Sequence, residues 1–177
     1  MRGFLSVRDE SARELQAAVL AFKSADRDLK REINKATRDT MNPVWRALVQ
    51  ANQAGTDAMT GRMLGGGVRI AAGNPPIAKA AQSTRKVGKR KDLVPASDYG
   101  PWEFGVPNRN EVSVYERRSP RGKVHQVRRR TMRGLPRRHQ DGRVVYPAFA
   151  EIAPRMVSLW VQLIVRKYHD AAERKRS

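Results

Sequence analysis

The chain opens with apolar residues at helical spacing, and residues 8–54 are predicted to be helical. Ser11 and Glu14 fit a capping box, in which the two side chains satisfy free backbone amides in the first turn of a helix. A second helix is expected from about Asp26. Its apolar stripe is predicted to consist of Leu29, Ile33, Ala36, Thr40, Val44, Leu48 and Ala51.

The other face of this second helix carries charges of both signs, which is typical of a solvated surface. Asn42-Pro43 interrupts the apolar stripe. Asn42 could cap a new helix with Pro43 in its first position, or a single helix could kink there. Gly55 is a natural stop for the helical part of the chain.

Residues 60–146 change character and are predicted to form a small antiparallel sheet with long connections. A run of three glycines precedes an expected strand at Val68–Ile70. The glycines are not followed by the Gly-Lys-Ser/Thr ending of a phosphate-binding loop, so they indicate a hinge or a bulge. From Asn74 to Leu93 the chain is polar and is expected to be a long connection.

A β-hairpin is predicted further along this middle part. Glu111–Tyr115 alternates polar and apolar residues, which is typical of a half-buried strand. Val124–Val127 could pair with it across a turn at Ser119–Gly122.

Tyr99–Gly105 is also predicted to be a short strand, because its aromatic residues are bounded by glycine and proline. Glu103 is the one acid inside it, and we interpret Glu103 as a strand-edge carboxylate paired with an arginine. An exposed strand edge here could pair between subunits. The residues expected in this sheet and subunit contact are Tyr99, Trp102, Glu103 and Phe104.

The C-terminal part, residues 147–174, is predicted to be an amphipathic helix with Pro147 or Pro154 in its first position. Its apolar stripe comprises Ile152, Met156, Leu159, Trp160, Leu163, Ile164 and Tyr168. Helices at both ends of the chain around a small antiparallel sheet give an α+β fold, with residues 1–177 as a single domain.

Positive charge is concentrated in two segments of the chain, here called the basic arms. Residues 85–91 contribute +5 and residues 117–143 contribute +10 of the total formal charge of +19. A localised positive field attracts anions. We therefore expect these arms to contact an anion or another subunit through Arg85, Lys86, Lys89, Arg90, Lys91, Arg117, Arg118, Arg128, Arg129, Arg130, Arg137 and Arg138.

Candidate chemistry is sparse. The chain has no cysteine, so disulfides and thiolate metal sites are excluded. None of its histidines, His125, His139 and His169, lies in a His-Glu-x-x-His pattern, so no metal or cofactor site is predicted. A ribonuclease would use His125 or His139 as general acid or base, but no catalytic site is visible. The chain shows neither a long apolar span nor a signal peptide at residues 1–8.

The order of these elements, with three local motifs, resembles the neck or tail-completion proteins of long-tailed bacteriophages, the broad family that includes the minor tail protein Z of phage lambda. The motifs are Thr60-Gly-Arg-Met-Leu64 after the long helix, Tyr99–Gly105, and Tyr146-Pro-Ala-Phe149 before the last helix. The resemblance spans roughly residues 26–173. Met63 is an extra residue in the first motif, and the chain between Gly105 and Tyr146 is unusually long and rich in arginine.

This resemblance implies a structural virion protein and not an enzyme, made in the host cytoplasm and assembled at the head–tail junction or upper tail. Its partners would be other copies of itself, in a ring of about six or twelve, and phage connector and tail proteins, without a membrane or a cofactor. The basic arms would contact either acidic neighbouring subunits or double-stranded DNA in the channel. The alternative is a sequence-nonspecific nucleic-acid-binding protein that acts on its own.

Overall fold

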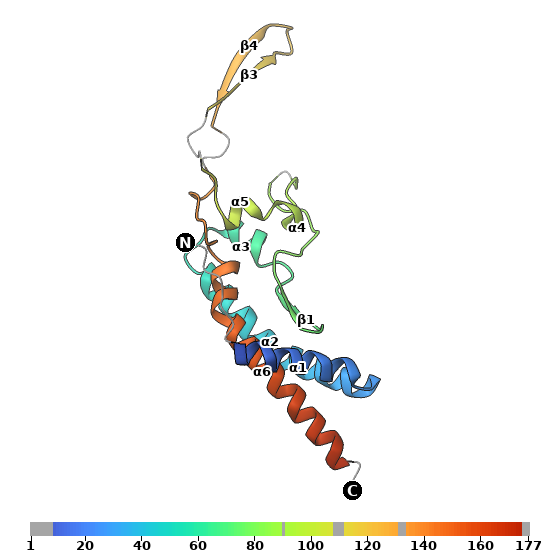
Figure 1. Ribbon diagram of the computed structural model, residues 1–177. Coiled ribbons are helices and arrows are strands. Elements are labelled where there is room, and N and C mark those ends of the chain that lie inside the picture. Colours follow the sequence, from blue (N-terminus) through green and yellow to red (C-terminus); the bar gives the residue numbers. More distant parts are fainter. Residues whose placement is uncertain (1–8, 90, 108–111, 131–133, 175–177) are drawn as a thin grey trace. The chain divides into compact units, whose positions relative to one another are not determined.

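The computed structural model describes residues 9–89, 91–107, 112–130 and 134–174 (Figure 1). The α+β class is confirmed, since helices are combined with two separate two-stranded antiparallel sheets. The helices are α1 (Asp9–Ser24), α2 (Arg27–Gln53), α3 (Ala58–Leu64), α4 (Pro95–Asp98), α5 (Gly100–Glu103) and α6 (Val145–Arg174). The strands are β1 (Arg69–Ala71), β2 (Ile77–Lys79), β3 (Ser113–Arg118) and β4 (Val124–Arg129).

The chain divides into two compact units, each built from separate stretches of sequence. Unit 1 comprises Met1–Ala51, Val68–Ala80 and Ala148–Ser177, and unit 2 comprises Asn52–Gly67 and Ala81–Pro147. Both long helices, α2 and α6, contribute residues to both units. The prediction of a single domain therefore stays a prediction.

In unit 1, α2 buries one stripe at intervals of four residues, as a helix packed on other helices does. The stripe begins with Leu29 and Ile33, as predicted, and the predicted Ala36 and Leu48 are partly covered, but the prediction is wrong for Thr40, Val44 and Ala51. Thr40 and Val44 are exposed. The larger side chains of Met41 and Trp45 define the buried face instead, and the buried set is Leu29, Ile33, Thr37, Met41, Trp45 and Val49.

The Asn42-Pro43 step does not start a new helix. α2 continues through Pro43, which lies inside it. The carboxamide oxygen of Asn42 accepts a hydrogen bond from the backbone N–H of Ile70 at 2.7 Å. Asn42 thus serves strand β1, and its side chain is not used as a helix cap. The predicted stop holds, because α2 ends at Gln53 and Gly55 has a positive φ of 85°.

Helices α1 and α6 complete the core of unit 1. The rings of Phe22 and Trp160 lie 6.1 Å apart, and the hydroxyl of Tyr168 donates a hydrogen bond to the carbonyl of Ala21. Two hydrogen bonds of 3.0 Å join Arg174 to Glu32. The buried stripe of α6 is Ala148, Ile152, Met156, Trp160 and Ile164.

Two predicted helix starts are wrong. α1 begins at Asp9, before Ser11, so Ser11 is not the residue that caps it. α6 begins at Val145, so neither Pro147 nor Pro154 is its first residue, and Pro154 lies inside the helix. The start of α6 is set by a side chain distant in sequence, described below, which local sequence patterns do not show.

The strand predicted at Val68–Ile70 is confirmed as β1, which pairs with β2 in the register Ile70↔Ala78. β2 lies in the stretch that the sequence analysis assigned to a polar connection, so that prediction is wrong. The indole N–H of Trp45 donates to the carbonyl of Lys79 at 3.0 Å, and Ile70 is only 1% exposed. Contacts with α2 therefore hold this short hairpin in place.

In unit 2, the predicted strand at Tyr99–Gly105 is wrong, because this segment is helical. α5 begins at Gly100 with Pro101 in its first turn, where the fixed φ of proline favours a helix. The N–H of Glu103 bonds to the carbonyl of Tyr99, and that of Phe104 bonds to Gly100. The aromatic residues of this segment consequently offer no strand edge.

Candidate functional site

The candidate site is the hairpin formed by β3 and β4, which confirms the predicted pairing across Ser119–Gly122. The strands pair antiparallel with Tyr115 opposite Val127. At the tip, the N–H of Gly122 bonds to the carbonyl of Ser119 at 2.9 Å, and Gly122 has a φ of 80°. Pro120 and Gly122 suit a tight turn of this kind, which explains why the hairpin could be predicted from local sequence. The predicted first residue of the strand, Glu111, lies outside the described residues.

The two faces of this hairpin differ because side chains alternate along each strand. The tyrosine face consists of Ser113, Tyr115, Arg117, His125, Val127 and Arg129. The glutamate face consists of Val114, Glu116, Arg118, Val124, Gln126 and Arg128. The tyrosine face contains no acid, whereas the glutamate face carries the only acidic side chain of the two strands.

Both faces are open to solvent. Every residue of β3 is exposed, and in β4 only Val127 is partly covered. Val114 is 52% exposed, Tyr115 42% and Val124 48%. Surface strands usually bury one apolar face, so a ribbon that buries neither lacks a packing partner among the described residues.

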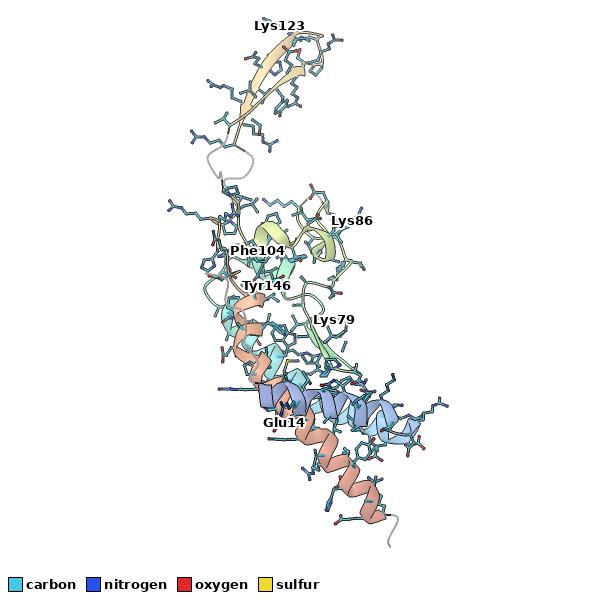
Figure 2. All side chains as sticks on the ribbon, viewed as in Figure 1. Glu14, Lys79, Lys86, Phe104, Lys123 and Tyr146 are labelled. Carbon is cyan, nitrogen blue, oxygen red and sulfur yellow. The ribbon has the colours of Figure 1, made fainter. Side chains whose placement is uncertain are left out.

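The hairpin is also strongly basic. Residues 113–129 contain six basic residues and one acidic residue, Glu116, which gives a net charge of +5. Five of the six are arginines, whose planar guanidinium group can bind a phosphate or carboxylate through two parallel hydrogen bonds. Figure 2 shows side chains extending away from this ribbon, with Lys123 at its tip.

The structure divides the second basic arm into two parts. Arg117, Arg118, Arg128 and Arg129 lie on the hairpin, and Arg130 follows it, all exposed. Arg137 and Arg138 lie instead on the segment that follows the hairpin, residues 136–139, here called the return segment. They are exposed too.

The return segment is fastened to the end of α5. The N–H of Val106 bonds to the carbonyl of Pro136 at 3.0 Å, and the N–H of His139 bonds to the carbonyl of Phe104 at 2.8 Å. Gly105, with a φ of 68°, lets the two backbones approach so closely that an added Cβ would lie 2.1 Å from the carbonyl oxygen of Arg137. The segment before the hairpin, residues 104–106, is thus bonded to the segment after it, residues 136–139.

The described residues of the first basic arm, 85–89 and 91, lie at a tight turn and not on a long arm. Val87 and Leu93 form an isolated antiparallel bridge, with the N–H of Val87 bonded to the carbonyl of Leu93 at 2.8 Å. Gly88 and Lys91 have positive φ angles of 93° and 53°. The predicted contact residues Arg85, Lys86, Lys89 and Lys91 are exposed, and Arg90 lies outside the described residues.

Glu103 has a role that the sequence analysis missed. Its side chain is fully buried, and its carboxylate accepts hydrogen bonds from the backbone N–H groups of Arg143, Val144, Val145 and Tyr146 at 3.0–3.2 Å. These amides form the start of α6, where a negative charge stabilises the helix dipole. The expected pairing of Glu103 with an arginine side chain is wrong, because its partners are backbone amides.

Phe104 and Tyr146 lie next to this cap. Their rings meet edge to face with centroids 4.9 Å apart. Both residues are labelled in Figure 2. Gly142, with a φ of 76°, makes room for the carboxylate, since a Cβ there would lie 2.4 Å from Oε1 of Glu103. Tyr99 and Trp102 belong to the same short helical region and are partly covered. The four residues predicted as a subunit contact thus lie in a region that supports the fold.

Several other described acids are also engaged within the fold. Asp57 caps α3 through hydrogen bonds from the amides of Met59 and Thr60 at 2.9 Å. Burial alone would raise the pKa of Asp57, but the hydrogen bonds from Thr60 and Met59 outweigh it and lower the pKa. The hydrogen bonds from Arg174 lower the pKa of Glu32. Asp26, Asp28, Asp98, Asp170 and Glu173 also have partners in their own unit.

The predicted histidines do not meet in one site. His125 lies on the tyrosine face opposite Arg117, and His139 lies on the return segment; both are exposed. His169, Asp170 and Glu173 on α6 each bring one ligand atom to within 4.8 Å of the others, which the spacing His-Asp-x-x-Glu could have indicated. His169 lies 3.6 Å from Glu173 and Asp170 pairs with Lys167 within the same helix. These contacts account for the arrangement, so it carries no proposal.

Unit 1 contains an apolar cavity of about 200 Å³ lined by Leu15, Pro75, Phe149, Trp160 and neighbours. Its lining offers no charged group, so it suggests no catalytic chemistry.

By length and composition α6 could cross a membrane, because an 18-residue window has a mean hydropathy of 1.4. Its buried stripe and its exposed Glu151, Arg155 and Arg166 are equally typical of a core helix. The predicted absence of a membrane stays a prediction.

Comparisons with known proteins add no family to this description. No protein-family model matches the chain, and neither a curated protein nor a solved structure matches it. The interpretation therefore depends on the residues themselves.

Proposed function

We propose that this protein is a structural component of a bacteriophage neck or upper tail, which assembles as a ring and helps to join the head to the tail. The observation that carries the proposal is the exposed, basic β3–β4 hairpin. An element that exposes both faces and a net charge of +5 is poorly suited to a monomer's core but well suited to contact with a partner.

The motifs behind the phage resemblance support this proposal through their contacts. Tyr99–Gly105 and the start of the Tyr146–Phe149 motif lie far apart in sequence, yet Glu103 and Phe104 both contact Tyr146. Two of the three motifs therefore form one structural feature, the start of α6.

A purely structural role also suits the chemistry of the described residues. The exposed histidines His125 and His139 lie on different segments, and neither has a carboxylate partner among the described residues. Exposed basic side chains dominate the candidate site, and these favour contact with anions over catalysis.

Sedimentation of the purified chain over a wide concentration range tests this function. We expect a closed oligomer, and we expect that oligomer to bind purified portal, connector or tail-tube proteins of the same phage. A chain that remains monomeric at the highest concentration and binds none of these proteins would contradict the proposal.

A second candidate is a nucleic-acid-binding protein that acts without a ring, and the same hairpin favours it. This candidate predicts tight, salt-sensitive binding of duplex by a monomer, with no affinity for phage connector proteins. The two functions therefore differ in the oligomeric state and in the protein partner.

A further inference from the structure

We propose that the β3–β4 hairpin binds double-stranded DNA, and that it lies in the major groove with its tyrosine face toward the bases. This inference deepens the proposed function and rests on it, since a ring at the head–tail junction surrounds the path of the DNA. It names the partner of the basic hairpin and the face that meets it.

A second hairpin is a poor partner, although neither edge of the ribbon is paired with a further strand among the described residues. Edge pairing of two copies would align two segments of +5 each, with arginines beside arginines. Charged residues along an edge are a common means of preventing such pairing. The partner of the hairpin must therefore be anionic.

The rest of this chain is not an anionic partner either. The sequence of unit 1 has 18 basic and 10 acidic residues, a net charge of +8, and that of unit 2 has 18 and 7, a net charge of +11. The acids Asp57, Glu32 and Glu103 already serve as caps or ion pairs within their own units. A neighbouring copy is therefore basic in both units, which favours DNA over an adjacent subunit.

The geometry of the hairpin suits the groove of B-DNA. Six residues in each strand give a ribbon about 20 Å long, at roughly 3.4 Å per residue. The major groove of B-DNA is about 12 Å wide and admits a two-stranded ribbon, whereas that of duplex RNA is deep and narrow. Arginines bind phosphate oxygens with their planar fork. The expected ligand is therefore duplex DNA.

The difference between the faces sets the orientation. On the tyrosine face, Tyr115 and Val127 form an apolar centre, which could contact thymine methyl groups. Arg117 and Arg129 flank this centre about 14 Å apart along the ribbon, at roughly 3.4 Å per residue, so they can reach separate phosphates. Glu116, on the opposite face, would be repelled by phosphates and is expected to point away from the DNA.

Fluorescence anisotropy with a mixed-sequence DNA duplex, measured over a series of salt concentrations, tests the orientation. Arg117→Ala with Arg129→Ala removes two charges from the tyrosine face, and we expect the salt slope to fall by about 1.8, at roughly 0.9 per lost phosphate contact. The matched control, Arg118→Ala with Arg128→Ala, removes the same charge from the glutamate face and is expected to lower the slope by less than half as much. Equal losses in the two variants would overturn the assignment of the face.

Competition tests the ligand class. Duplex RNA and heparin should compete at least tenfold less well than duplex DNA of the same length. Equal competition would mean that the hairpin attracts any polyanion, and would overturn the groove assignment. A different result would also overturn the inference: the wild-type chain binds a connector protein but no DNA, and replacing Arg117 and Arg129 abolishes that protein binding. The partner would then be an acidic protein surface.

Sedimentation of the same samples separates this inference from the proposed function. A ring that forms and binds connector proteins without binding duplex would overturn the inference alone. A monomer that binds duplex with the predicted face dependence would overturn the ring function alone. Circular dichroism of each variant should match the wild type, because the replaced arginines are exposed.

Discussion

The two hairpins of this protein have the same topology but opposite surroundings. β1–β2 is tied to α2 through Trp45 and Asn42, and its residue Ile70 is buried. β3–β4 is longer and exposed on both faces, and five of its residues at positions 113–129 are arginines. An isolated two-stranded hairpin is marginally stable in water, so the surroundings of each hairpin determine its stability.

The difference suggests separate roles for the two hairpins, one in the fold and one in contact with a partner. The short hairpin contributes an apolar side chain to the core of unit 1 and uses its backbone groups to bind α2. The long hairpin contributes little to a core, and its charge lowers its affinity for the rest of a basic protein. We interpret the first hairpin as part of the scaffold and the second as an element presented to an anionic partner.

Replacing Trp45 with alanine should have the largest effect on this comparison. The variant removes a nearly fully buried ring and the hydrogen bond to Lys79 that anchors β2. We expect the free energy of unfolding to fall by about 3–5 kcal/mol, measured by urea denaturation. The matched change in the other hairpin, Tyr115→Ala, should alter it by no more than about 0.5 kcal/mol. Similar losses for both variants would mean that the long hairpin is also packed.

A smaller loss of stability is expected for Glu103→Gln, which tests the cap at the start of α6. The substitution removes the negative charge and turns an NH₂ group toward backbone amides that need an acceptor. The free energy of unfolding should fall by about 2 kcal/mol, which is the usual contribution of a hydrogen bond to a charged group. Glu116→Gln in the long hairpin is the control and should leave stability unchanged. If both variants were neutral, the buried carboxylate would not be the cap that we describe.

The smallest effect is expected for Asp57→Ala, which removes the N-cap of α3. Loss of such a cap costs about 1 kcal/mol at neutral pH. Because the folded pKa of Asp57 lies below its usual 3.8, the contribution is complete above pH 3.8 and is lost as the pH falls through the lowered value. Thermal denaturation curves of variant and wild type should therefore converge in acid. A difference that persists unchanged in acid would contradict the role of the carboxylate.

The parts of the fold that follow local patterns could be predicted from the sequence. The β3–β4 hairpin was predictable because alternation marks its strands, and Pro120 and Gly122 suit its turn. The long helices were predictable from apolar spacing, although the buried face of α2 follows Met41 and Trp45 and not Thr40 and Val44.

The features that depend on long-range contacts could not be predicted. Aromatic residues between glycine and proline at Tyr99–Gly105 are compatible with a strand or a helix, and the outcome is stabilised by Glu103 binding amides some forty residues away. The same contact sets the start of α6 at Val145. β2 was missed because its three residues become a strand only through pairing with β1 and contact with Trp45.

For the candidate site, the sequence located the charge but not its arrangement. The sequence groups Arg137 and Arg138 with Arg128 and Arg129 in one basic arm, yet the structure places them on the return segment, which is bonded to residues 104–106. Only the register of the strands shows that Arg117 and Arg129 share a face free of acid. Charge density therefore predicted an anion-binding arm, and geometry supplies a specific face for it.

Hydrogen exchange of the backbone amides tests the central contrast most directly, in the free protein and with a DNA duplex added. In the free protein, we expect β1–β2 to be protected and β3–β4 to exchange rapidly, because exposed hairpins open at low free-energy cost. Addition of duplex should protect β3–β4 and leave β1–β2 unchanged. Equal protection of both hairpins in the free protein, with no change in β3–β4 on adding duplex, would contradict the account.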